Sequence, residues 1–246
     1  MQPMRAFCSL FLQKCWKKNI PAHLHDPQNL WVGLSVRART IVYHKDRVKP
    51  EELSSYADLA EPQWKGRLVL RTSKKVYNQS LVASLIAERG ETEAERIVKG
   101  WVDNLAVAPF SSDTKTLEAM VAGVGDGAVV NTYYFGRLLK DNPELPLAIF
   151  WPDQSGAGVH INVSGAGVTK YAKNKTEAVK LLEWLSSEKA QGQFAALNME
   201  YPANQAIAAD SVVAAWGDFK GNSMNVAKYG EYQADAIKLM DRAGYK

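Results

Sequence analysis

Three tyrosines lie where α/β proteins bind their ligands. Tyr133 and Tyr134 directly follow a predicted strand (128–131) and fall in the first turn of the next predicted helix. Tyr77 follows another predicted strand (66–71) after a short turn and also falls early in a helix. Ligands of open α/β sheets bind outside the carboxyl ends of the strands, where helix N-termini also point. We therefore expect the three side chains to converge on one crevice; the alternative is that they are packing residues of amphipathic helices.

The acidity of a phenol limits what three converging tyrosines can bind. A phenol titrates near pH 10, so ionising one at pH 7 costs about 4 kcal/mol and ionising three costs about 12 kcal/mol. A neutral ligand or a weakly bound divalent ion hardly offsets this cost, whereas a hard, highly charged cation gains from each deprotonated oxygen. Softer metals prefer Cys or His, and neither flanks these tyrosines. Fe(III) is the abundant cation that fits best.

Two arginines, Arg37 and Arg39, follow a predicted strand (31–36). On an extended segment their side chains point to the same side. A guanidinium group is always charged and binds planar oxyanions through two parallel hydrogen bonds. We expect one of the two to hold a carbonate-like co-ligand or to balance tyrosinate charge. A structural or surface arginine pair is the alternative.

The elements around these residues alternate between strand and helix, which predicts a mostly parallel α/β sheet. Predicted strands span 31–36, 40–43, 66–71, 107–110, 128–131, 147–150, 160–163 and 166–169. Predicted helices span 50–59, 74–88, 91–105, 113–122, 133–140, 175–187, 192–197 and 229–243.

Composition and motifs exclude several classes of protein. The 246 residues are 46% hydrophobic and 23% charged, an ordinary globular composition. No apolar run approaches the ~20 residues of a membrane-spanning helix, so we expect no membrane span. The net charge of +4 comes from scattered Lys and Arg without interleaved aromatics, so no nucleic-acid partner is expected. The sequence has no G-x-S-x-G, P-loop or H-E-x-x-H motif, and we expect no enzyme.

The N-terminus is unusual. Both cysteines, Cys8 and Cys15, lie in it, so the remainder has no disulfide framework and no cysteine-based zinc site. The short apolar stretch 6–12 lacks the small-residue ending of a cleaved secretory signal. We expect a truncated or disrupted start rather than a working signal peptide.

From about residue 19 onward, the sequence resembles the bacterial periplasmic ferric-iron-binding proteins, the substrate-binding components of iron ABC transporters. The tandem tyrosine preceded by Asn131 is the most specific element of the resemblance. The resemblance rests on the segments SVRARTIVY (35–43), KVYNQS (75–80), NTYYFGR (131–137), NVSGAGVTK (162–170) and EYPAN (200–204).

The resemblance implies an α/β, two-lobed periplasmic-binding-protein type II fold in which the first lobe is partly missing. Residues 1–36 and 164–208 would form this incomplete lobe one. Residues 37–163 would form lobe two with the tyrosine site, and residues 209–246 would form C-terminal helices that pack on lobe two.

The resemblance also implies a function. The family's tandem iron-binding tyrosines match Tyr133 and Tyr134, its third tyrosine matches Tyr77, and the arginine that faces the anion or the tyrosinates matches Arg37. The expected protein is a periplasmic monomer that binds Fe(III) in the interlobe cleft, with carbonate or another synergistic anion, and delivers it to an inner-membrane ABC permease. The alternatives are a solute-binding protein for another anionic or organic ligand and a non-functional truncated fragment.

Overall fold

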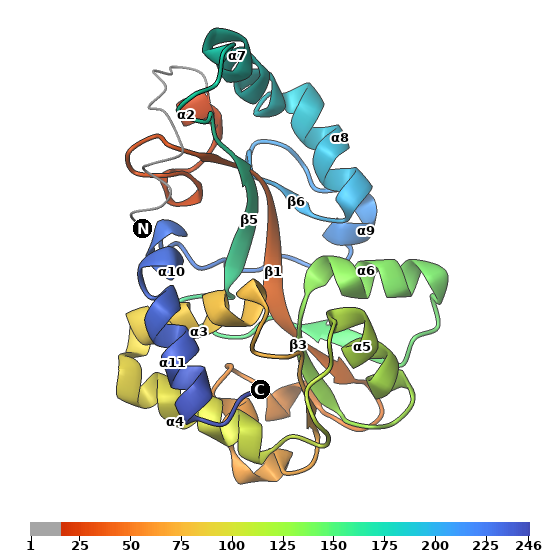
Figure 1. Cartoon of the computed structure of the whole chain (residues 1–246). Coiled ribbons are helices and arrows are strands. Elements are labelled where there is room, and N and C mark those ends of the chain that lie inside the picture. The colour runs from red at the N-terminus through yellow and green to blue at the C-terminus, as the bar shows by residue number, and fades with distance from the viewer. Residues whose placement is uncertain (1–15) are drawn as a thin grey trace. The chain divides into compact units, whose positions relative to one another are not determined.

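The computed structural model describes residues 16–246, which fall into two compact units (Figure 1). Both cysteines and the apolar stretch 6–12 lie outside the described residues. Unit 1 comprises the described part of Met1–Arg37 together with Ile161–Gly217 and Ser223–Glu231. Unit 2 comprises Ala38–His160, Asp218–Asn222 and Tyr232–Lys246. The long strand β1 (Val32–His44) runs through the boundary between them.

Unit 2 contains the end of β1 and most of the regular structure. Its other strands are β2 (Leu68–Val69), β3 (Gly127–Asn131) and β4 (Leu147–Phe150). Its α-helices are α3 (Val76–Arg89), α4 (Glu91–Asp103), α5 (Asp113–Val121), α6 (Thr132–Asp141) and α11 (Gln233–Arg242). Its 3₁₀ helices are η2 (Pro50–Glu52), η3 (Asp58–Ala60) and η4 (Pro62–Trp64).

The sheet of unit 2 has the strand order β2-β3-β1-β4. β2 and β3 are parallel, but β1 runs antiparallel to both of its neighbours, with Arg39 opposite Asn131 and Ile41 opposite Phe150. The prediction of a mostly parallel sheet is therefore wrong, as is the division of β1 into two strands. A strand buried on both faces is mostly apolar, as β3 is before Asn131, and such a run carries no signal of direction.

The helix predicted at 50–59 is also wrong. This segment forms η2 and the start of η3, separated by a turn. The Asp58 carboxylate accepts hydrogen bonds from the backbone N–H groups of Ser54 (2.5 Å) and Ser55 (2.6 Å). Such side-chain acceptors offer the backbone an alternative to helical hydrogen bonds. The turn places Tyr56 in the core, where its hydroxyl donates to the Arg39 carbonyl at 2.5 Å.

The core of unit 2 lies between the sheet and its helices. α3 packs against α4 and α11, and these three helices lie side by side in Figure 1. Trp64 and Trp101 are among the largest fully buried side chains. Packing against Trp64 is close, because a Cβ added at Gly127 would lie 2.6 Å from its Cζ3 atom. Each fully buried large apolar side chain stabilises a fold by about 1.5–3 kcal/mol.

Unit 1 is built around the first half of β1. Its strands are β5 (Ile161–Ala166) and β6 (Tyr201–Pro202), and both pair with β1. Its helices are α2 (Trp16–Asn19), η1 (Ala22–Leu24), α7 (Lys175–Leu185), α8 (Glu188–Asn198), α9 (Ser211–Ala214) and α10 (Ala227–Glu231). The C-terminal helices are therefore divided, since α9 and α10 belong to unit 1 and α11 belongs to unit 2.

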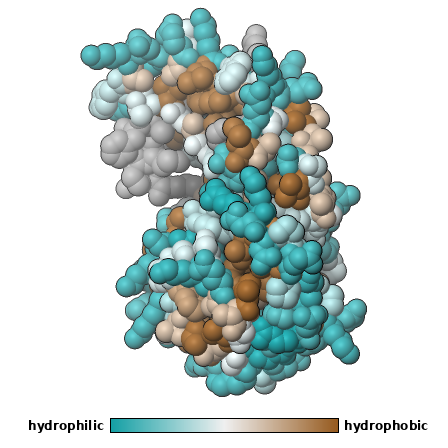
Figure 2. All heavy atoms as spheres, turned by 90° about the vertical axis from the view of Figure 1, so that its right-hand side faces the viewer, coloured by the Kyte–Doolittle hydropathy of each residue, from teal (hydrophilic) through white to brown (hydrophobic). Residues whose placement is uncertain are grey.

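The surface carries hydrophilic and hydrophobic side chains side by side (Figure 2). On unit 1, Leu181 and Trp184 of α7 are 54% and 51% exposed, and Leu197 of α8 is 85% exposed. Single exposed apolar side chains are normal on protein surfaces. Along residues 16–246, no helix combines the length and apolarity that crossing a membrane requires.

Candidate metal centre

The structure brings the three predicted tyrosines together within unit 2. Tyr77 is the second residue of α3, and Tyr133 and Tyr134 are the second and third residues of α6. The Tyr133 hydroxyl donates to the Tyr77 hydroxyl at 3.4 Å. The rings of Tyr133 and Tyr134 lie with their centroids 4.3 Å apart and their planes at 33°. Two helices far apart in sequence thus present three phenols to one place.

The tandem tyrosine is positioned by the junction between β3 and α6. β3 ends at Asn131, and α6 begins at the next residue. An asparagine at this position ordinarily caps a helix with its side chain. Here the Asn131 side-chain oxygen instead accepts a hydrogen bond from Arg39 at 3.1 Å, and among the described residues α6 has no side-chain cap. The partial positive charge of the helix N-terminus therefore stays available to anionic groups nearby.

Arg71 adjoins the tyrosines, and the sequence analysis missed it. Its Nη1 atom lies 3.5 Å from the Tyr134 hydroxyl. Its guanidinium carbon lies 5.2 Å from the centre of the Tyr77 ring and 5.9 Å from that of Tyr134. The signal was present, because Arg71 ends the same predicted strand (66–71) that leads to Tyr77. A second arginine, the exposed Arg137, has its guanidinium carbon 5.0 Å from the centre of the Tyr133 ring.

A buried ionic network lies behind the phenols. Asp113, 0% exposed, has a carboxylate oxygen 3.1 Å from Arg39 Nη1 and 3.7 Å from Arg71 Nη1. Arg39 also donates to Asn78 at 2.9 Å and to the Val129 carbonyl at 3.0 Å. Arg39 is thus a structural arginine that ties β1 to its neighbours. Because two guanidinium groups share one carboxylate, the network carries a net positive charge beside the tyrosines.

Tyr133 is protonated in the metal-free site. Burial raises the pKa of its phenol well above the ordinary value, and hydrogen bonding with Tyr134 and Tyr77 raises that pKa further, while Asn131 opposes the rise. A ligand that needs ionised Tyr133 must therefore displace a tightly held proton. This requirement favours a strongly charged cation over a neutral ligand.

Arg37, the predicted anion-binding residue, lies in unit 1. Its Nη1 atom donates to the Ser164 hydroxyl on β5 at 2.6 Å. Anion binding by Arg37 stays a prediction. Within unit 2, the arginines beside the phenols are Arg71 and Arg137.

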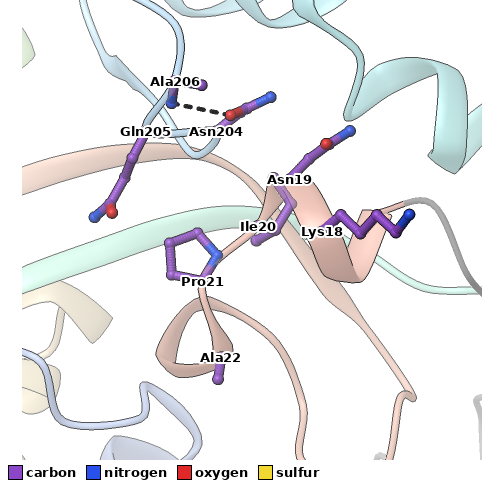
Figure 3. Close-up of a pocket in the computed structure, with 8 residues that line it drawn as sticks. All are labelled: Lys18, Asn19, Ile20, Pro21, Ala22, Asn204, Gln205 and Ala206. Carbon is purple, nitrogen blue, oxygen red and sulfur yellow. Dashed lines mark hydrogen bonds between the residues drawn. The ribbon is translucent and has the colours of Figure 1, made fainter.

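The described residues outside the tyrosine cluster are poorly suited to hold a metal ion. Within residues 16–246, no group of three or more His, Cys, Asp or Glu side chains is arranged to hold a metal ion. Unit 1 has an open cavity of about 250 Å³ (Figure 3). It is lined by Lys18, Asn19, Ile20, Pro21, Ala22, Asn204, Gln205 and Ala206. This lining includes neither a carboxylate nor a phenol to hold a cation.

Comparison with known proteins places the chain in a family. A family model described as bacterial extracellular solute-binding protein matches residues 8–217. The chain belongs to the bacterial extracellular solute-binding protein family. The chain is similar to iron uptake protein A1 of a Synechocystis species, with 45% identity over 234 residues. These residues cover 93% of this chain and 65% of that protein, so the chain spans only part of the relative's length.

Solved structures of similar proteins bear on the fold. The Trichodesmium protein IdiA (FutA), solved in complex with iron and citrate ligands, matches with a TM-score of 0.94 and 45% identity over 98% of this chain and 78% of that one. Ferric iron-binding protein A of Mannheimia haemolytica, solved in an open conformation, matches with a TM-score of 0.92 and 37% identity over 97% of this chain and 77% of that one. These similarities confirm the predicted family resemblance and the α/β, two-lobed fold class.

Proposed function

We propose that this protein binds Fe(III) through Tyr77, Tyr133 and Tyr134. The observation that carries the proposal is the convergence of three phenols from α3 and α6, with two hydroxyl groups 3.4 Å apart. The iron is cargo, held and released without catalysis. On binding, each phenol gives up its proton and coordinates as phenolate, so binding of one Fe(III) releases three protons. The three negative charges of the phenolates balance the three positive charges of the iron.

The positive charges near the phenols favour their ionised forms. Among the described residues, neither α3 nor α6 has a side-chain cap, and the positive end of each helix dipole lies at the tyrosines. Arg71 adds a full positive charge within contact distance of Tyr134. Three phenolates cost about 12 kcal/mol to form at pH 7, and the burial of Tyr133 adds to that cost. These positive charges offset part of it.

Three tyrosines leave coordination positions of Fe(III) open. We infer that an oxygen-donating anion, such as carbonate or a carboxylate, fills some of them. One similar protein was solved with iron and citrate ligands, which supports an anionic co-ligand. Arg37 is the candidate to hold this anion, because a guanidinium group binds planar oxyanions in bidentate fashion.

We further infer that the protein acts in iron import as the periplasmic, monomeric component of an ABC transporter and delivers Fe(III) to an inner-membrane permease. The support is the family match together with the name of the similar Synechocystis protein, iron uptake protein A1.

The test of iron binding is spectroscopic. Metal-free protein is titrated with ferric citrate, and one equivalent should produce a visible tyrosinate-to-iron charge-transfer band. The double variant Tyr133→Phe, Tyr134→Phe should show no band. Tyr171→Phe is the matched control, because Tyr171 is 83% exposed on unit 1 and should leave the band unchanged.

Two results would refute the proposal. A folded wild-type protein that stays colourless with ferric citrate would favour a binding protein for another anionic or organic solute. An undiminished band in the double variant would show that iron binds elsewhere.

A further inference from the structure

We propose that Arg71 is a positioning residue whose guanidinium group is held ready for the tyrosinates and sets the strength and colour of the iron site. This inference rests on the proposed function and names a residue through which that site acts. Its basis is the contrast between the fixed backbone of Arg71 and the unpaired Nε donor of its side chain.

The backbone of Arg71, two residues after the end of β2, is held firmly. Its carbonyl accepts hydrogen bonds from the Tyr245 hydroxyl (2.5 Å) and from the Asn78 side chain (2.7 Å). Arg71 also forms a parallel bridge with Phe110. A side chain that starts from so well fixed a backbone needs little further ordering to meet its partner.

The side chain of Arg71 is buried but incompletely satisfied. The residue is 7% exposed, and among the described residues its Nε atom has no hydrogen-bond partner. Its Nη1 atom is 3.7 Å from Asp113, whereas Arg39 Nη1 is 3.1 Å from the same carboxylate oxygen. Asp113 is therefore chiefly the partner of Arg39. A buried guanidinium group with an unpaired donor and a long contact to its carboxylate is costly unless another anion completes it.

The tyrosines can become the anions that complete it. Arg71 Nη1 lies 3.5 Å from the Tyr134 hydroxyl, and its guanidinium carbon lies over the Tyr77 ring at 5.2 Å. When Tyr134 coordinates Fe(III) as a phenolate, the long contact with a neutral hydroxyl becomes a charge-assisted hydrogen bond, which is shorter and about twice as strong. Arg71 thus gains its anionic partner only in the iron-bound protein. An interaction present only in the bound state stabilises that state and so raises the affinity for iron.

Removing this charge has two consequences. Fe(III) affinity should fall about 10- to 100-fold, as it does when an outer-shell partner of a metal ligand is lost. The charge-transfer band should move to longer wavelength, because a cation beside a phenolate stabilises the electrons that the ligand donates to iron. A residue that only supported the fold would change the amount of colour without moving the band.

The experiment compares Arg71→Met, Arg71→Lys and Arg89→Met with the wild-type chain. Arg89→Met is the matched control, because Arg89 pairs with Asp153 at 2.7 Å and lies about 18 Å along α3 from Tyr77. Iron affinity is measured by competition with citrate, the band position by visible absorption, and the thermal midpoint of the metal-free protein by circular dichroism.

Arg71→Met should weaken iron binding, shift the band to longer wavelength and leave the thermal midpoint of the metal-free protein unchanged or higher. Arg71→Lys, which keeps the charge but loses the planar fork, should restore part of the affinity and of the band position. A folded Arg71→Met protein with wild-type affinity and band position overturns the role of Arg71 alone. A wild-type protein without any band overturns the proposed function and this inference together.

Discussion

Replacing Asp113 with asparagine tests the ionic network behind the phenols. Asp113 is 0% exposed and faces Arg39 at 3.1 Å and Arg71 at 3.7 Å. At the effective dielectric constant of about 20 that suits protein sites, each attraction amounts to about 4–5 kcal/mol. In the wild-type chain the Asn131 backbone N–H donates to the Asp113 carboxylate at 3.2 Å. Asparagine at position 113 keeps an acceptor for this hydrogen bond but leaves two buried cations uncompensated.

The expected loss is smaller than the sum of the two attractions, because the aspartate no longer has to be desolvated on folding. Removal of one partner from a buried ion pair destabilises a protein by about 3–5 kcal/mol. We expect Asp113→Asn to lower the free energy of unfolding by that amount, measured by urea denaturation with an unchanged m-value. Hydrogen exchange of α3 and β3 peptides should assign the loss to unit 2.

Two companion variants sharpen the test. Asp46→Asn is the matched control, because its carboxylate is 79% exposed, and it should change stability by no more than about 0.5 kcal/mol. Adding Arg71→Met to Asp113→Asn removes one of the two uncompensated cations and should recover at least about 1 kcal/mol. A loss below about 1 kcal/mol in Asp113→Asn, or no recovery in the double variant, would refute the electrostatic reasoning.

Three further predictions concern unit 2. Gly127→Ala should destabilise it by about 1–3 kcal/mol in urea denaturation, because the new Cβ would lie 2.6 Å from Trp64. Tyr133→Phe should lower the stability of the metal-free protein by no more than about 1 kcal/mol in the same assay, because the hydrogen bond to the Tyr77 hydroxyl is 3.4 Å long. The same variant should lose iron binding. Glu88→Gln should raise the thermal midpoint at pH 7, because burial raises the pKa of Glu88 and the glutamine can still accept the hydrogen bond from Asn222.

The pH dependence of Glu88 has a definite sign. A carboxyl group with a raised pKa binds its proton more tightly in the folded protein than in the unfolded chain. Its contribution to stability is therefore complete below the ordinary value of 4.5 and is lost as the pH rises through the raised pKa. The thermal midpoint of Glu88→Gln should exceed that of the wild type at pH 7 and approach it near pH 4.5. Equal differences at both pH values would contradict this account.

The placement of the tyrosines could be predicted from the sequence because it is local. A short apolar strand ending at Asn131 and a helix beginning at the next residue put Tyr133 and Tyr134 at the carboxyl end of the strand. The same reasoning applied to Tyr77 at the start of α3. Local propensity and the intrinsic acidity of a phenol depend little on distant residues, so the sequence alone is enough to infer both.

Local patterns misled where a side chain competed with the helical backbone or where strand direction mattered. The apolar and charged spacing at 50–59 is compatible with a helix, but the Asp58 carboxylate binds the amides of Ser54 and Ser55 instead. The direction of β1 against β3 and β4 is set by which strands meet, not by the residues of any one strand.

Residue type and spacing alone thus determined which groups could hold a hard cation and at which edge of the sheet they would stand. Only the tertiary structure decided how charge is distributed around them. Arg39 and Asp113 lie 74 residues apart, yet they form a buried ion pair that gives Arg39 a structural role. Arg71, from a third segment, contacts the phenols instead. Long-range pairing and register bring such groups together, and these depend on the packing of the whole unit rather than on any stretch of sequence.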